Sequence, residues 1–203
     1  MTEASEKAIK MIVAFEVTSE STYTSKYQST IWPGGQSGVT IGIGYDLGYT
    51  TNDKLQADWG DKLPAAMIAE LKQAVGVTGT AAKEMAAHLA PQVLVPWDAA
   101  NAVFRERDVP NYSAMVRKAL ANTGLLSGDS FGALLSLTFN RGPSFKAVGD
   151  RYREMNAIRD LMAAKNFAAI PAQFMAMQRL WPTVAGLRAR REKESKLFAG
   201  GLV

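Results

Sequence analysis

The feature that most constrains the fold is a glycine-rich stretch at residues 32–48, WPGGQSGVTIGIGYDLG. It contains six glycines, at positions 34, 35, 38, 42, 44 and 48. Glycine tolerates backbone conformations that other residues avoid and lets two backbone segments approach closely. Such a stretch turns back on itself and does not continue as a helix. We predict a turn at 33–35, a strand at 39–45, and a β-rich segment over 22–49 that includes Tyr23 and Tyr27.

The rest of the chain has the pattern of a helical protein. A first helix is predicted over 5–16, with Ser5 as its cap. From residue 64 onward, prolines and glycines separate segments that are predicted as helices at 65–75, 80–90, 97–108, 112–121, 130–140, 151–164, 172–179 and 187–198. We therefore predict an α+β fold in one domain, 1–203, with a cleft between two lobes. The predicted lobes are a β-rich lobe at about 17–60 and a helical lobe at about 64–203, which the N-terminal helix 5–16 joins.

Composition excludes several classes of site. Cysteine is absent, which removes disulfides and thiolate metal sites. His88 is the single histidine, which argues against a His-based zinc site and against a Ser-His-Asp triad. We interpret His88 as an ordinary helix residue. The N-terminal sequence lacks the pattern of a conventional signal peptide, and no run approaches the roughly eighteen apolar residues that span a bilayer. We expect synthesis in the cytoplasm and no stable membrane insertion.

The net charge of +4 favours acidic partners, including nucleic acid and anionic cell-wall polymers. The basic residues gather in the last third of the chain, where acidic residues interleave with them. This mixture indicates a solvated helix face more than a nucleic-acid site. The residues concerned are Arg188, Arg190, Arg191, Glu192, Lys193, Glu194 and Lys196.

Glu16 is the first candidate for a chemical role. On a helical wheel it falls on the same arc as Ala8, Ile9 and Ile12, at the last turn of helix 5–16. Desolvation and the negative end of the helix dipole are both expected to raise its pKa, as a general acid requires. The alternative is that the helix has already ended and Glu16 points to water. Glu20 is a rival, but it lies in a Ser/Thr run typical of an exposed loop.

Thr40 and Asp46 are the second candidates. If the strand persists, their side chains share one face with Gly42 and Gly44, and the two glycines leave an open trough for sugar rings. A carboxylate on each side of such a turn is what hydrolysis of a glycosidic bond requires. The alternative is a glycine-rich hairpin in which Asp46 only caps a turn.

Three segments together resemble the phage-type lysozymes, glycoside hydrolase family 24. The first is the helix ending in Glu16 followed by T-x-G-x-G-[H/Y], here TIGIGY. The second is FGALLSLTFNRG at 131–142, and the third is WPTVAGLRARREKESKLF at 181–198. They occur in the order expected for the family and cover both ends and the middle of the chain. The resemblance implies a lysozyme-like fold.

The resemblance also implies roles for individual residues. The catalytic glutamate of the family corresponds to Glu16 and its strand threonine to Thr40. The usual aspartate precedes the threonine by about six residues, where this chain has Gly34. Asp46 instead follows the threonine, which is similar to the pesticin-like muramidase variant. By this likeness, Asp46 and Thr40 position a water molecule.

The implied reaction is hydrolysis of the β-1,4 bond between N-acetylmuramic acid and N-acetylglucosamine in peptidoglycan, with inversion and without metal or organic cofactor. Water attack implies carboxyl groups roughly 6.5–9.5 Å apart. Candidates for substrate contact are Trp32, Tyr45, Asn140 and Arg141. For each of them a packing or structural role is the alternative.

Other functions remain open at this stage. A lytic transglycosylase or chitinase of the same fold would need different chemistry, and a non-catalytic wall-binding module would need none. As an enzyme, the chain is expected to act as a monomer in the periplasm or cell wall. It would reach that place through a holin, as a phage endolysin does, or by secretion as an antibacterial effector with an immunity protein.

Overall fold

The computed structural model describes residues 2–202, and most of them are helical. The described part of the chain also contains one two-stranded antiparallel sheet, which places it in the α+β class. The chain divides into two compact units. Unit 1 contains the residues up to Phe15 and those from Val109 onward, and unit 2 is Glu16–Asp108.

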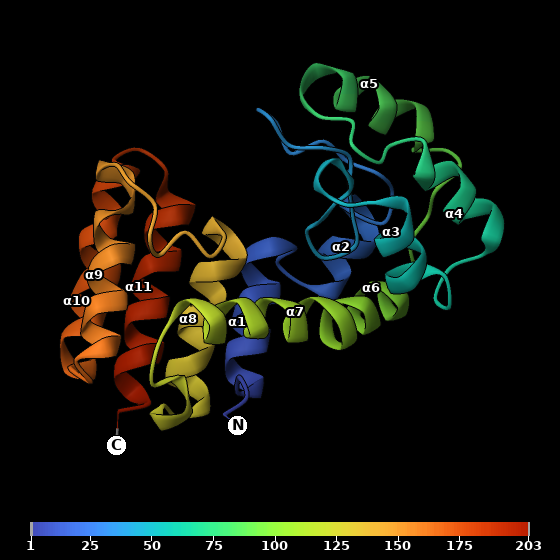
Figure 1. Cartoon of the computed structure of the whole chain (residues 1–203). Helices are drawn as coiled ribbons and strands as arrows, with labels where there is room; N and C mark the ends of the chain where they lie inside the picture. The colour runs from blue at the N-terminus through green and yellow to red at the C-terminus, as the bar shows by residue number, and fades with distance from the viewer. Residues whose placement is uncertain (1, 203) are drawn as a thin grey trace. The chain divides into compact units, whose positions relative to one another are not determined.

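Unit 1 is a bundle of helices. Its core element is α8, in which every residue from Ser130 to Thr138 is buried. α11 packs on both α8 and α10, while α9 packs on α10 (Figure 1). The helices are α1 (Glu6–Glu16, which ends in unit 2), α7 (Val109–Ala119), α8 (Gly128–Arg141), α9 (Arg153–Ala163), α10 (Ile170–Ala176) and α11 (Ala185–Gly200). Short 3-10 turns are η3 (Thr123–Leu125), η4 (Asp150–Tyr152), η5 (Phe167–Ala169) and η6 (Met177–Leu180).

The first helix forms where the sequence predicts it. Ser5 is its cap, because the Ser5 hydroxyl accepts a hydrogen bond from the backbone N–H of Ala8 at 3.1 Å. Ala8, Ile9 and Ile12 are buried on one side. Gly132 of α8 lies against Ala8 so closely that a methyl group at Gly132 would overlap the Ala8 side chain. A small residue at this crossing therefore lets α1 approach α8.

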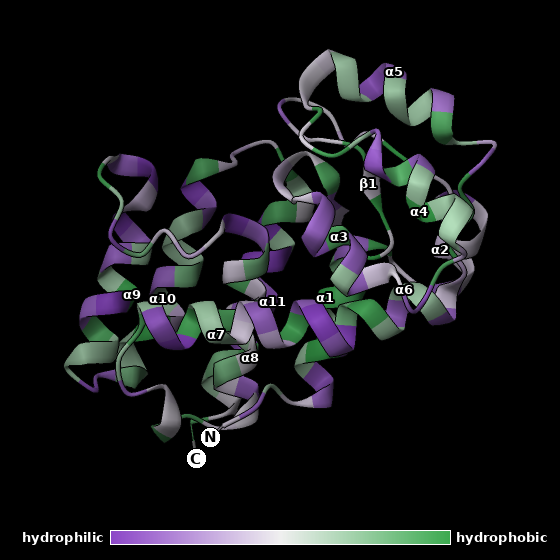
Figure 2. Ribbon diagram, turned by 45° about the vertical axis from the view of Figure 1, so that its right-hand side comes forward, coloured by the Kyte–Doolittle hydropathy of each residue, from purple (hydrophilic) through white to green (hydrophobic). Residues whose placement is uncertain are grey.

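Unit 2 surrounds the small sheet with short helices. Its elements are α2 (Glu20–Lys26), β1 (Thr40–Ile41), β2 (Tyr45–Asp46), η1 (Leu47–Tyr49), α3 (Asn52–Trp59), α4 (Ala65–Lys72), α5 (Gly79–Leu89), α6 (Trp97–Val103) and the π-helical turn η2 (Phe104–Asp108). Hydrophobic and hydrophilic residues alternate along α5, and also along α7 of unit 1 (Figure 2). This alternation is typical of amphipathic helices with one face in a core.

The predicted β-rich segment at 22–49 is wrong in its first part. Residues 20–26 form α2, because the Ser19 hydroxyl accepts from the Thr22 N–H at 3.1 Å and caps the helix. Tyr23 is buried on this helix, and its hydroxyl donates to the carbonyl of Val95 at 2.9 Å. Glu20 is exposed in the first turn of α2 and does not lie in a loop.

The predicted continuous strand at 39–45 is also wrong, because the chain turns at residues 42–44. Gly42 and Gly44 have φ of +58° and +79°, which L side chains rarely adopt. A methyl group at Gly42 would lie 2.7 Å from the Trp59 ring. Gly42 is therefore buried against Trp59 and is no part of an open trough, and the turn creates the hairpin of β1 and β2.

The helices predicted after residue 64 are confirmed with shifted ends, except that no break separates the predicted helices 97–108 and 112–121. There α6, η2 and α7 follow one another directly from Trp97 to Ala119. α3 was missed. The unit boundary also differs from the predicted lobes, because α4, α5 and α6 belong with the sheet in unit 2 and not with the later helices. Within residues 2–202, no helix combines the length and the apolar character needed to cross a membrane.

Candidate functional site

Most of the predicted site residues lie in unit 2. Glu16, Trp32, Thr40, Tyr45 and Asp46 all fall within Glu16–Asp108. The structure brings Thr40 and Asp46 together, because they are register partners across the antiparallel pair of β1 and β2. Side chains of such partners stand on the same face of a sheet. The predicted shared face is thus present, although a hairpin and not a continuous strand produces it.

The carboxylate of Asp46 stabilises the hairpin through hydrogen bonds to the backbone. Its Oδ1 accepts hydrogen bonds from the backbone N–H groups of Gly38 at 3.0 Å and Gly48 at 2.8 Å. Its Oδ2 lies 3.2 Å from the same Gly38 nitrogen. Asp46 is half-buried and is the cap of η1, so the turn-capping alternative describes what its side chain does. Thr40 is buried beside it and donates to the Gly38 carbonyl at 3.4 Å.

Glu16 is the last residue of α1 and is half-buried. The helix ends there because Thr18 has a φ of +67°, in the left-handed region. Ser19 then donates to the Val17 carbonyl at 2.8 Å, and α2 begins at the next residue. A β-branched residue in this conformation is strained, and strain of this kind clusters at functional sites.

Tyr45 and Trp32 each have an internal hydrogen-bond partner. Tyr45 is buried, and its hydroxyl donates to Asp58 Oδ2 at 2.8 Å. Its ring meets Trp59 edge-on with centroids 5.5 Å apart, and burial raises its pKa. Trp32 is half-buried and its indole N–H donates to the Ser37 carbonyl at 3.1 Å. For Tyr45 the packing role is the one observed.

Asn140 and Arg141 lie in unit 1, at the end of α8. Asn140 Oδ1 accepts from Arg191 Nη2 at 3.2 Å. Arg141 donates to the carbonyl of Arg151 at 2.6 Å and places its guanidinium 5.0 Å from the Trp181 ring centroid. Burial lowers the pKa of Arg141. These contacts correspond to the structural alternative for both residues.

Sequence reasoning missed a buried acidic pair in unit 2. Asp58 and Asp108 are only 6% and 7% exposed, and Lys54 pairs with Asp58 at 2.5 Å. Burial raises the pKa of Asp108 to about 7; the charge of Asp58 adds to the shift and that of Lys54 opposes it. Asp58 falls on the buried side of α3 next to Trp59. On a helical wheel over 52–59, Asp58 falls on the same side as Leu55 and Trp59. The sequence would therefore indicate a buried Asp58 once a helix is predicted there.

A second buried charge cluster corrects the prediction that residues 188–196 form a solvated face. Glu194 Oε1 accepts from Ser136 Oγ at 2.6 Å, Arg191 Nη2 at 2.8 Å and Arg190 Nε at 3.3 Å. All four residues are buried, because this side of α11 packs on α8 and α10. Burial raises the pKa of Glu194 and lowers that of Arg191 to about 10.

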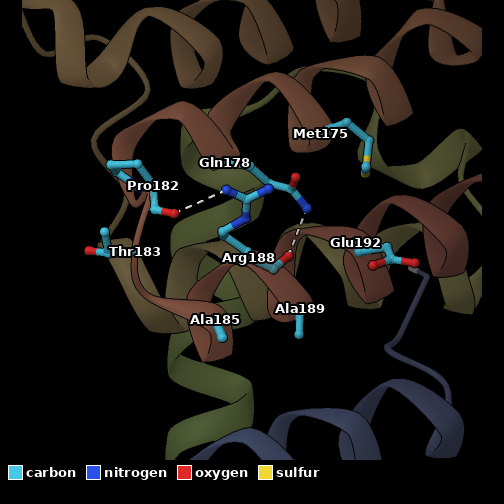
Figure 3. A pocket seen from close by; sticks show the side chains of 8 residues that line it. All are labelled: Met175, Gln178, Pro182, Thr183, Ala185, Arg188, Ala189 and Glu192. Atoms are coloured by element: carbon cyan, nitrogen blue, oxygen red, sulfur yellow. Dashed lines mark hydrogen bonds between the residues drawn. The ribbon is translucent and has the colours of Figure 1, made fainter.

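A surface hollow of about 410 Å³ lies where η6 leads into α11 (Figure 3). Two of its polar side chains donate to nearby backbone carbonyls. Arg188 donates to the Pro182 carbonyl at 3.2 Å, and Gln178 donates to the Arg188 carbonyl at 2.9 Å. The predicted site residues are not among those that line it. Among residues 2–202 there is also no group of three or more His, Asp or Glu side chains placed to hold a metal ion.

Comparison with known proteins gives one family match. Residues 12–105 match a family described as a domain of unknown function (DUF8812). The match covers slightly less than half of the chain and nearly coincides with unit 2. A search of curated proteins finds no match. The part of the chain that resembles this family is therefore the unit that contains Glu16, Thr40 and Asp46.

Proposed function

We propose that this protein is a peptidoglycan hydrolase, an N-acetylmuramidase with a lysozyme-like fold. The observation that carries the proposal is the pairing of Thr40 with Asp46 on a hairpin, within the same compact unit as the half-buried Glu16. The resemblance of residues 131–142 and 181–198 to phage-type lysozymes supports it. The net positive charge of the chain suits an anionic wall.

In this proposal Glu16 donates a proton to the glycosidic oxygen as the bond breaks. Asp46 and Thr40 hold the water that attacks the sugar from the opposite face, which inverts the anomeric centre. Asp46 suits this role in one respect, because two backbone N–H groups fix the orientation of its carboxylate. Oδ1 takes the two shorter bonds, so Oδ2 is the oxygen proposed to face the water. A carboxylate held in place in advance loses little freedom when the water binds.

The reaction proposed for this site needs no resident metal or cofactor. Acid and base both come from side chains of unit 2, and the nucleophile is water. Trp32, which is half-buried, is proposed to stack on a sugar ring. The enzyme is proposed to work in the cell wall, after release by a holin or after secretion.

The decisive experiment is digestion of purified peptidoglycan by the wild type and by Glu16→Gln. Loss of the proton donor should lower the cleavage rate at least about 100-fold. Glu20→Gln is the matched control, since Glu20 is an exposed glutamate four residues away in α2. Cleavage retained by Glu16→Gln would remove the muramidase proposal. Wall binding without cleavage by the wild type would favour a non-catalytic module.

One observation favours a second candidate, a lytic transglycosylase. The hydrogen bonds described for Asp46 all go to backbone N–H groups, a structural use that a single-acid mechanism would leave undisturbed. The variant Asp46→Asn distinguishes the hydrolase from the transglycosylase. It keeps the hairpin contacts, because the Asn oxygen can still accept from the N–H groups of Gly38 and Gly48, but it removes the carboxylate. A hydrolase should lose at least about 100-fold in rate, whereas a transglycosylase should stay active. Mass spectrometry of the products decides, because 1,6-anhydro ends identify the transglycosylase.

A further inference from the structure

We infer that unit 1 carries a binding site for a linear polyanion with repeated phosphate groups, in a groove between α1 and α11. The groove has a volume of about 420 Å³. Four lysines and two apolar side chains line it: Lys7, Lys10, Met11, Lys193, Lys196 and Leu197. We call it the lysine groove. The inference is independent of the proposed function, since no residue assigned to catalysis takes part.

The spacing of the lysines suits an extended ligand. Lys7 and Lys10 are three residues apart on α1, and Lys193 and Lys196 are three residues apart on α11. Residues at this spacing lie on the same face of a helix, separated by about 4.5 Å along its axis. Each helix therefore contributes a short row of two cations, and both rows line one groove. A chain with regularly repeated anions matches such an arrangement better than a single ion does.

The charge of these lysines is available to a ligand. The side chains of Lys7 and Lys196 are 70% and 74% exposed, and each is paired with one carboxylate, Asp129 at 3.1 Å and Glu192 at 2.6 Å. Exposed ion pairs of this kind contribute little stability, so a polyanion can compete for the lysines. Lys193 lies 5.2 Å from the Phe15 ring centroid, a contact that orients the ammonium group without neutralising it.

The neighbouring arginines of α11 do not share this role. Arg190 and Arg191 are buried with Glu194, so their charge is matched inside the bundle. The charged residues that line the groove are all lysines. Arginine presents a planar fork that suits carboxylate and phosphate alike, whereas lysine binds phosphate oxygens as a point charge without a fixed paired geometry. Four point charges in two rows therefore suit the repeated phosphates of a flexible polymer, and polyglutamate is the polycarboxylate competitor in the test below.

The floor of the groove argues against a membrane or a nucleic acid as the ligand. Leu197 is only 4% exposed, so it lines the bottom and does not protrude. Among the described residues, the large exposed hydrophobic side chains lie elsewhere, at 49, 94, 125, 148, 175, 184 and 202. Membrane-surface helices insert protruding apolar side chains, and single-stranded nucleic acids stack on exposed aromatic rings. A hydrophilic chain such as a polyol phosphate requires neither.

The test measures binding of fluorescent poly(glycerol phosphate) to the full chain by anisotropy. This probe has no glycosidic bond, so hydrolytic activity cannot affect the result. The groove variant changes Lys7, Lys10, Lys193 and Lys196 to Gln together. The matched control changes four other exposed lysines to Gln, Lys26, Lys83, Lys118 and Lys146, and so removes the same net charge.

We expect the groove variant to bind at least about tenfold more weakly and with a shallower salt dependence, while the control stays within about threefold of the wild type. Equal losses in the two variants would overturn the inference in favour of general charge attraction. Tighter binding of polyglutamate, of an oligonucleotide, or of vesicles with equal parts phosphatidylglycerol and phosphatidylcholine would overturn the phosphate-polymer assignment. If the groove variant does not fold, protection of the four lysines of the wild type from acetylation by the probe decides instead. Unprotected lysines would contradict the site.

Discussion

The backbone N–H of Gly38 donates to both carboxylate oxygens of Asp46, at 3.0 and 3.2 Å. This contact ties the residue two positions before Thr40 to the residue that faces Thr40 across the sheet. Asp46 therefore organises the hairpin whatever else it does. If it also positions water, one carboxylate has a structural and a chemical role. Substitutions at Asp46 must then be compared in stability as well as in rate.

Gly38→Ala should destabilise the protein through this contact. A methyl group at Gly38 would overlap Asp46 Oδ1 and the backbone nitrogen of Gly48, and neither atom can move without breaking the hairpin. We expect a loss of about 3 kcal/mol in the free energy of unfolding, measured by urea denaturation. Gly186→Ala is the control, since nothing lies within 4 Å of that site. Equal stability of the two variants would contradict the role given to Gly38.

The sequence predicted the helices of unit 1 well because proline and glycine mark their ends, and because α1 has a cap at Ser5 and an apolar side. The prediction was wrong where composition and local hydrogen bonding favour different structures. The Ser/Thr-rich run at 19–26 favours strand or loop by composition, yet Ser19 caps a helix there. Alternation at 39–45 predicted a strand, but alternation does not reveal the sign of φ at Gly42.

The candidate site was predictable only in part. Thr40 and Asp46 lie on the same face both in a continuous strand and in the hairpin that is observed. The prediction that they share a face therefore holds although the continuous strand was wrong. The burial of Arg190, Arg191 and Glu194 was not predictable in the same way. A helix with charges all around it has no apolar side to indicate which face is covered. Its partners α8 and α10 decide that, and they are distant in sequence.

The strained Thr18 gives a second prediction. Thr18→Gly removes the steric cost of a β-branched residue at a φ of +67°, although the flexible glycine loses part of that gain. We expect a net increase of about 0.5–1 kcal/mol in the free energy of unfolding. Thr24→Gly is the control, because Thr24 is exposed within α2 and glycine there should cost up to about 1 kcal/mol. A loss of stability in both variants would show that Thr18 is not strained.

The buried cluster of α11 gives a third. Glu194→Ala leaves Arg190 and Arg191 buried without the carboxylate that accepts from both. Breaking a buried pair in this way costs about 3–5 kcal/mol, so we expect a large fall in thermal stability. Glu192→Ala removes a glutamate two positions away whose partner Lys196 is exposed, and it should cost less than about 1 kcal/mol. Similar melting temperatures for both variants would contradict the burial of Glu194.

The buried acidic pair predicts how stability depends on pH. The pKa of Asp108 is raised from 3.8 to about 7 in the folded protein, so between these values the folded state holds a proton that the unfolded state has released. The free energy of unfolding should therefore fall as pH rises across this window and level off above it. The groups that act on Asp108 are Asp58 and Lys54 from α3, together with Tyr45 from β2.

Asp108→Asn tests this dependence, because asparagine resembles the protonated acid and cannot ionise. We expect the variant to match the wild type near pH 4 and to exceed its stability near pH 8 by on the order of 3 kcal/mol, measured by urea denaturation across the pH range. Asp53→Asn is the control, since Asp53 is exposed in the first turn of α3 and should leave the slope unchanged. If Asp108→Asn retained the wild-type slope between these pH values, another group would be responsible. The buried pair would then not carry the charge repulsion that the structure indicates.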